Sequence, residues 1–169
     1  EDDSPTNLIA NGSFDDDNGW TALSMWGDDV EGNGVVTIAG GEVAFTETVA
    51  GPWTKQMAVY TTVTLTAGTY QFDMDMSFND IVEIWGEVYI GTEMPVAGTE
   101  YNGDQQVLKA LNGWDCATSY TGTAVLHGCD ESDNSGEFDI AEDGTYYLLF
   151  RAGGNSYGTT GVILDNWTI

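Results

Sequence analysis

Basic side chains are scarce in this chain of 169 residues, which has 3 Lys and Arg against 28 Asp and Glu and a formal net charge of −25. A surface this acidic repels phosphate backbones, which excludes nucleic acid as a partner, and it also disfavours anionic lipid surfaces. Sulfated or uronic-acid-rich glycans are disfavoured by the same repulsion. A neutral partner, a cation or no partner at all remains.

Long hydrophobic runs are also missing, since no apolar stretch approaches the roughly 18 residues of a membrane-spanning helix, and we predict no membrane insertion. Proline is rare, with 3 residues, while 41% of the residues are hydrophobic, as in a globular domain. We predict an acidic leader at residues 1–6 and a single domain at 7–169. The opening Glu1–Ser4 resembles the acidic tract of surface lipoproteins, with a plain solvated terminus as the alternative.

Histidine and cysteine are too few for a zinc site, which needs about four well-spaced ligands, because His127 is the only histidine. The two cysteines, Cys116 and Cys129, lie in a segment rich in Gly, Thr and Ser, and we predict that they form a disulfide. This bond would close a loop of about fifteen residues and stabilise the fold by roughly 3 kcal/mol. A disulfide indicates an oxidising compartment, so we predict an extracellular or outer-membrane surface location.

Apolar and polar residues alternate with a period of two along most of the chain, and helical periodicity is almost absent. Thr69–Phe78 and Ile81–Ile90 alternate most clearly, and the short turn between them predicts an antiparallel hairpin. Further strands are predicted at Val35–Ile38, Glu42–Val49, Met57–Leu65, Gly122–Leu126, Glu137–Ile140, Gly144–Ala152 and Val162–Ile169. About ten short strands in one domain indicate an all-β fold, a sandwich or a barrel.

One segment departs from this pattern. Asp104–Leu111 has a helical pattern and lies in a long irregular region, Met94–Gly136, which also contains Trp114 and the cysteines. A loop of this length in one domain is typical of a functional segment or an insertion.

One face of the predicted strand Ile81–Ile90 interleaves aromatic and acidic side chains: Glu83, Trp85, Glu87 and Tyr89. Asp75 of the preceding strand is expected alongside them. This combination suits a sugar, whose C–H faces stack on aromatic rings while its hydroxyls need carboxylate acceptors. The alternative is that Trp85 and Tyr89 form a minor core under the Met94–Gly136 loop.

Four motifs follow one another along the chain: Asn7–Asp15 (NLIANGSFD, followed by Gly19-Trp20), Thr62–Tyr70 (TVTLTAGTY), Gly144–Leu148 and Ile163–Trp167. In this order they resemble the motifs of carbohydrate-binding modules of family 4 and its relatives, families 16 and 22. The resemblance spans nearly the whole chain. It implies a jelly-roll sandwich without catalytic activity that binds a β-glucan, xylan or a similar chain. The departures are the insertion around the two cysteines and Trp167, where a valine is usual.

The resemblance also implies a structural calcium ion. Carried over to this sequence, the ligands are the carbonyl of Ser13 and the side chains of Asp15, Glu42 and Asp165. Hard oxygen ligands with a net charge near −3 suit Ca²⁺. A solvated acidic turn is the alternative for Asp15.

The remaining tryptophans divide into two groups. Trp20 and Trp167 are expected in the core or at its rim, whereas Trp26, Trp53 and Trp114 are candidate ligand platforms on loops. Arg151 shares a strand face with Tyr147 and is expected to pair with a carboxylate or to donate to a sugar hydroxyl.

We therefore predict a non-catalytic module, a monomer or part of a larger protein, that binds a neutral β-glucan, with laminarin-type β-1,3-glucan ahead of xylan or mixed-linkage glucan. The first rival is a jelly-roll glycoside hydrolase using Glu83 and Glu87. Their Cα atoms would lie roughly 13 Å apart on a strand, against the ~5.5 Å between carboxyl groups of a retaining enzyme. In addition, the retaining glycoside hydrolases of family 16 carry their two glutamates in a Glu-x-Asp-x-Glu run, and Trp85 stands here in place of the aspartate. The second rival is a structural or adhesive surface domain.

Overall fold

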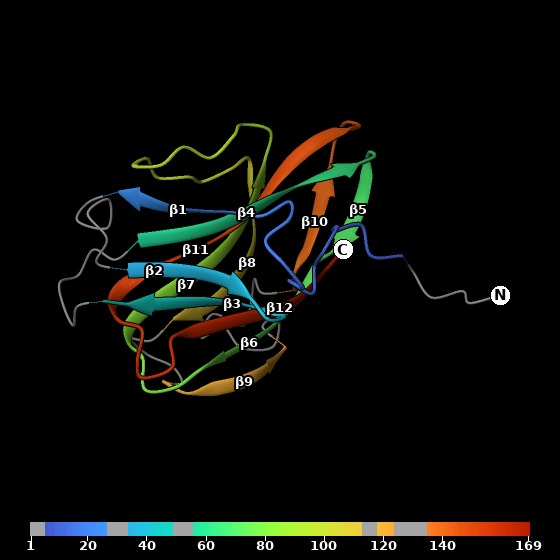
Figure 1. Ribbon diagram of the computed structural model, residues 1–169. Helices are drawn as coiled ribbons and strands as arrows, with labels where there is room; N and C mark the ends of the chain where they lie inside the picture. The colour runs from blue at the N-terminus through green and yellow to red at the C-terminus, as the bar shows by residue number, and fades with distance from the viewer. Residues whose placement is uncertain (1–5, 27–33, 49–55, 113–117, 124–134) are drawn as a thin grey trace.

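The computed structural model describes residues 6–26, 34–48, 56–112, 118–123 and 135–169 (Figure 1). Within these ranges the chain is all-β, and none of its elements is a helix that could cross a membrane. The strands are β1 (Thr21–Trp26), β2 (Gly34–Ala39), β3 (Glu42–Glu47), β4 (Gln56–Leu65), β5 (Gly68–Gln71), β6 (Asp73–Phe78), β7 (Val82–Gly91), β8 (Gln105–Asn112), β9 (Tyr120–Thr123), β10 (Glu137–Ile140), β11 (Gly144–Ser156) and β12 (Val162–Thr168).

Two antiparallel sheets of five strands pack face to face (Figure 1). Sheet A has the order β1-β4-β11-β7-β8 and sheet B the order β2-β3-β12-β6-β9, while β5 and β10 form a separate two-stranded sheet. Most neighbouring strands are distant in sequence, the exceptions being the pairs β2–β3 and β7–β8, as in a jelly roll. The predicted β-sandwich is thus confirmed.

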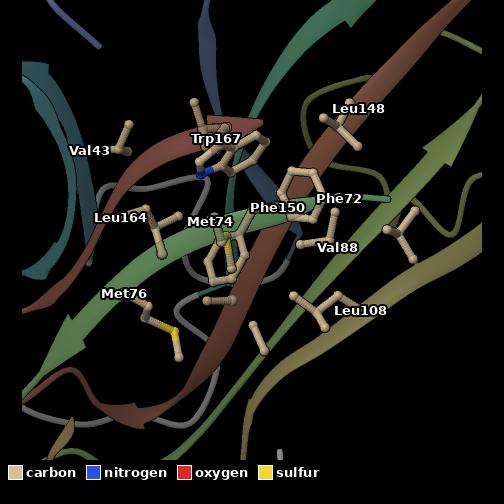
Figure 2. Close-up of a cluster of buried hydrophobic side chains, with 14 of the residues drawn as sticks. Val43, Phe72, Met74, Met76, Val88, Leu108, Leu148, Phe150, Leu164 and Trp167 are labelled. Atoms are coloured by element: carbon tan, nitrogen blue, oxygen red, sulfur yellow. The ribbon is translucent and has the colours of Figure 1, made fainter. Parts of the chain in front are cut away.

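The core lies between the two sheets, because each central strand turns every second side chain inward. Sheet A contributes Val88 and Phe150, and sheet B contributes Met74 and Leu164, all of them buried (Figure 2). Burying one such side chain stabilises the fold by roughly 1.5–3 kcal/mol. The outward-facing positions of the same strands are left for polar groups and for a site.

The N-terminal motif and the last strand form one aromatic cluster. Trp167 is fully buried and packs edge-on against Trp20 and Phe14, with ring centroids 5.0 and 5.8 Å away. The Trp167 amide donates to the carbonyl of Gly12 at 2.8 Å, and any side chain at Gly12 would collide with the Trp167 carbonyl. Both tryptophans therefore belong to the core, as the sequence predicted.

The predicted hairpin is wrong. β6 pairs with β12 and β9 in sheet B, whereas β7 pairs with β11 and β8 in sheet A, so residues 79–81 cross from one sheet to the other. Both strands turn their apolar faces to the same core from opposite sides. The alternation of apolar and polar residues is the same for two strands paired in one sheet as for two strands in facing sheets, so it could not distinguish them. The predicted strand Thr69–Phe78 is also divided at the buried Phe72, because β5 pairs with β10 instead.

The predicted helix at Asp104–Leu111 is also wrong, since this segment forms strand β8. β8 pairs along β7, with Leu108 opposite Val88 and Lys109 opposite Glu87. These long-range contacts override the local helix propensity of a short segment. The long irregular region is therefore interrupted by β8 and β9, while strand β1 was not predicted at all.

Candidate functional site

Four half-buried aromatic side chains share the outer face of sheet A: Tyr60 of β4, Trp85 and Tyr89 of β7, and Tyr147 of β11. Their neighbours in sequence, such as Val59, Ile84 and Leu148, point into the core. We call this surface, together with Arg151, the aromatic face. Partly exposed aromatics gathered on one side of a sheet are costly for a surface that only meets water.

Arg151 of β11 is the polar centre of the aromatic face, although it is only 6% exposed. Its guanidinium carbon lies 5.3 Å from the ring centroid of Trp85 and 4.6 Å from that of Tyr89, close enough for cation–π attraction. Nε and Nη2 donate to Oε2 of Glu87 at 3.3 and 3.0 Å, and Nη1 donates to Oε1 of Glu100 at 3.0 Å. The predicted pairing of Arg151 with a carboxylate is confirmed.

The hydroxyl of Tyr89 joins this network. It donates to Oε2 of Glu87 at 3.1 Å and accepts from Nε2 of Gln106, also at 3.1 Å. Burial raises the pKa of Tyr89, and so does the negative charge of Glu87, while Arg151 works in the opposite direction. The phenol therefore stays protonated at neutral pH, and the ring is held in one orientation.

Trp85 lies across the neighbouring strand at a glycine. Gly153 is its register partner on β11, and a Cβ atom there would come within 2.8 Å of Cζ2 of the indole and 2.6 Å of Cγ of Gln56. Glycine thus lets the indole rest on the sheet with part of its surface open to solvent. Such an arrangement can present a flat apolar platform to a ligand.

The connection between β7 and β8, residues 92–104, packs over one side of the aromatic face. Tyr101 from this connection is buried against Met25, Ala58 and Leu149, and the amide of Gly98 donates to the carbonyl of Ser24 at 2.9 Å. Three rings of the aromatic face, Tyr60, Tyr89 and Tyr147, pack against this second cluster. The minor core foreseen as an alternative therefore exists beneath the connection, and it involves Tyr89 but not Trp85.

Glu83 and Glu87 have different surroundings. Glu83 adopts a left-handed backbone conformation with φ of 49°, and it accepts from Nδ2 of Asn155 at 3.4 Å. Glu87 accepts both from Arg151 and from Tyr89. The pair is therefore arranged as hydrogen-bond acceptors fixed by separate partners.

Asp75 lies on the opposite side of the sandwich, because β6 belongs to sheet B. It pairs in register with Asp165 and accepts from Nδ2 of Asn166 at 2.9 Å. These two aspartates and Glu42 line a depression of about 340 Å³ on the outer face of sheet B. The structure does not bring Asp75 together with Trp85.

The residues expected to hold calcium lie in two adjoining pairs. Oγ of Ser13 donates to Oδ2 of Asp15 at 3.2 Å, while Glu42 and Asp165 line the depression on sheet B. The amide of Gly41 donates to the carbonyl of Phe14 at 3.1 Å, which brings the start of β3 beside the N-terminal motif. Among the described residues, no three His, Cys, Asp or Glu side chains gather closely enough to hold a metal. The donor types suit Ca²⁺, and the ion itself stays a prediction.

Several predicted site residues lie outside the described ranges: Trp53, Trp114, Cys116 and Cys129. Trp26, which we expected in a loop, ends strand β1. Sequence reasoning missed Tyr60, Glu100 and Tyr101. The alternation of β4 could have placed Tyr60 outward, but only the pairing of β4 with β11 shows that it lies beside Tyr147, 5.9 Å away between ring centroids.

No family of known protein sequences matches the chain, and no curated protein does. Among solved structures, it is similar to the enzymatically active domain of tailspike protein 4 of bacteriophage CBA120, with a TM-score of 0.50 and 11% identity over 96% of this chain and 21% of that one. It therefore spans about a fifth of the tailspike chain.

Two carbohydrate-binding modules were also found. One is TmCBM61 in complex with β-1,4-galactotriose, with a TM-score of 0.48, 12% identity and 97% of both chains covered. The other is described as CBM4, with a TM-score of 0.33, 14% identity, and 95% of this chain and 97% of that one covered. At such identities the tailspike similarity concerns the fold alone, and that fold is the jelly-roll sandwich that the sequence motifs imply.

Proposed function

We propose that this chain is a non-catalytic carbohydrate-binding module and that the aromatic face of sheet A binds the glycan. The observation that carries this proposal is the set of four half-buried aromatic rings on one sheet face, two of which, Trp85 and Tyr89, flank a buried arginine and its acidic acceptors. The motif resemblance supports it independently, because those motifs lie in the core and the turns, and Tyr147 is the one residue that they share with this face.

The contacts of the aromatic face suit sugar binding. Trp85 offers a ring for stacking, worth on the order of 1–3 kcal/mol by analogy with aromatic platforms for nucleobases. Glu83 and Glu87 supply charged acceptors for hydroxyl groups, at about 1.5–3 kcal/mol each. Because Arg151 already fixes Glu87 and Tyr89, little side-chain entropy is lost when the ligand binds.

For the ligand, we propose a neutral β-glucan, with laminarin-type β-1,3-glucan ahead of xylan or mixed-linkage glucan. The net charge of −25 disfavours acidic polysaccharides. The rings of Tyr60 and Tyr147 are inclined at 65° to each other, so they cannot form the coplanar strip that a flat crystalline surface requires. A curved or helical chain fits inclined rings better.

The rival activity, glycoside hydrolysis by Glu83 and Glu87, finds less support. A retaining pair needs carboxyl groups about 5–5.5 Å apart, one of them with its proton. Glu87 is held by the guanidinium of Arg151 and by the hydroxyl of Tyr89, so its carboxylate is fixed by these partners and not directed at a second carboxyl group. Glu83, four positions along the strand, is bonded to Asn155 instead.

We further propose that the module acts outside the cytoplasm and carries a structural calcium ion. The cysteine pair supports the first point, since disulfides persist in oxidising compartments. The chemistry of the donors Ser13, Asp15, Glu42 and Asp165 supports the second, because all four supply oxygen atoms and a hydrogen bond from Gly41 to Phe14 links the segment before β3 to the N-terminal motif. The three carboxylates, all within the described ranges, do not converge in the structure, so binding would require them to move together.

Calorimetric titration with laminarin, xylan, mannan and alginate tests the function. We expect micromolar to millimolar binding of laminarin that responds little to salt, and no release of reducing sugar. Trp85→Ala should weaken binding by about 1–3 kcal/mol, the value of one stacking ring. Asp75→Asn is the matched control, because Asp75 lies on the opposite face and the variant should bind as wild type does.

The outcomes separate the alternatives. Unchanged affinity in Trp85→Ala with a loss in Asp75→Asn would move the site to sheet B. Salt-dependent binding of alginate without laminarin binding would overturn the ligand class. Release of reducing ends would establish the hydrolase.

A further inference from the structure

The described cations of this acidic chain lie on one face. Of the three basic residues, Lys109 and Arg151 are in the described ranges, and Lys55 is not. Arg151 and Lys109 are the register partners of Glu87 on either side, on β11 and β8. The row Arg151–Glu87–Lys109 therefore crosses the aromatic face, where an acidic ligand would find positive charge despite the net charge of the chain.

The guanidinium of Arg151 has two edges with different partners. Nε and Nη2 face Glu87, whose side chain is 22% exposed, and Nη2 also donates to the hydroxyl of Tyr89 at 3.3 Å. Nη1 faces Glu100, whose side chain is 53% exposed and comes from the β7–β8 connection. Glu87 thus belongs to the sheet, whereas Glu100 is the solvent-side partner.

We propose that Glu100 occupies the anion-binding edge of Arg151 and thereby makes the aromatic face select neutral over acidic glycans. This inference rests on the proposed function. A guanidinium edge is the natural partner of a carboxylate, including that of a uronic acid. The carboxylate of Glu100 already fills that position, and it repels a second carboxylate. Glu100 is therefore a specificity-determining residue that acts by exclusion.

The position of Glu100 makes the exclusion local. Its carboxylate is bonded to Nη1 at 3.0 Å, so a ligand group bound there would replace it directly. Acidic residues that do not contact Arg151 act only through the long-range field, which salt screens within about 8 Å at physiological ionic strength. Removing the charge of Glu100 should therefore do more than removing an equal charge elsewhere on the same connection.

Glu100→Gln tests the inference against Glu93→Gln, which removes the same charge from the same exposed connection. The probes are laminarin and laminarin oxidised at C6 to carboxylates, so the chain is the same and only the charge differs. Glu100→Ala is a second variant, because a glutamine amide can still accept from Nη1. Glu100 is half-exposed and Arg151 keeps Glu87 and Tyr89 as partners in either variant, so we expect both Glu100 variants to fold with melting temperatures close to that of wild type.

We expect wild type and Glu93→Gln to bind oxidised laminarin at least tenfold more weakly than laminarin. Glu100→Gln and Glu100→Ala should bind the oxidised chain at least tenfold more tightly than wild type, with laminarin affinity within twofold, and added salt should diminish the gain. Equal affinities of the Glu100 and Glu93 variants for the oxidised chain would overturn the inference while leaving the proposed function intact. Absence of binding to any neutral glycan in all variants would instead overturn the proposed function.

Discussion

Removing the hydroxyl of Tyr101 should stabilise the protein. Tyr101 lies on the β7–β8 connection, is 7% exposed, and packs in the second cluster on the aromatic face. Its hydroxyl oxygen is buried and has no hydrogen-bond partner, and it lies close to Gly91. Burial and the nearby charge of Asp104 raise the pKa of Tyr101 to about 12. Tyr101→Phe keeps the ring and its packing and deletes only the unsatisfied group.

The expected magnitude follows from the cost of an unsatisfied polar group. A buried hydroxyl without a partner costs about 1–3 kcal/mol of desolvation, so the free energy of unfolding should rise by about 1 kcal/mol or more. For a domain of this size, 1 kcal/mol corresponds to a shift of roughly 2–4 °C in melting temperature. Tyr146→Phe is the control, because that hydroxyl donates to the carbonyl of Glu142 at 2.7 Å. Its loss should cost about 0.5–1.5 kcal/mol.

Thermal and denaturant unfolding of both variants measure these effects, which should have opposite signs. The pH dependence provides a second readout. A tyrosine whose pKa rises from 10.0 to about 12 on folding loses its stabilising contribution as the pH rises through that interval, so wild type should lose stability there faster than Tyr101→Phe. Equal destabilisation by both variants would show that the Tyr101 hydroxyl has a partner and would refute the reasoning.

Two further predictions concern the calcium ion and the disulfide, both of which are expected to stabilise the fold. Calcium bound by Asp15 and Asp165 would stabilise the native state by about 2.7 kcal/mol at a hundredfold excess over Kd, so EDTA should lower the melting temperature by several degrees; an identical curve in EDTA would contradict the calcium site. If Cys116 and Cys129 are bridged, thiol titration of the native, unreduced protein should find no free thiol, and reduction should lower stability by roughly 3 kcal/mol. Two thiols titrating without reductant would exclude the bridge.

The fold class could be read from the sequence. Period-two alternation identified most strands, because this signal is local along the chain. The resemblance of four motifs to carbohydrate-binding modules implied a jelly roll, and the structure brings the first and last of these motifs together, where the amide of Trp167 donates to the carbonyl of Gly12. The outward side of β7, with Trp85 and Glu87, was likewise fixed by alternation.

Strand partners were decided by the tertiary structure alone. Alternation gives the face of a residue but not the sheet, so Asp75 was expected beside Trp85 and lies on the other side of the sandwich. The segment Asp104–Leu111 has a helical pattern but forms a strand paired with β7, because long-range contacts outweigh a local preference in a short segment. Glu100 reaches Arg151 across 51 positions of sequence, a distance that no local pattern encodes. The sequence by itself determined which side chains face outward, and only the packing of the two sheets determined which of them meet.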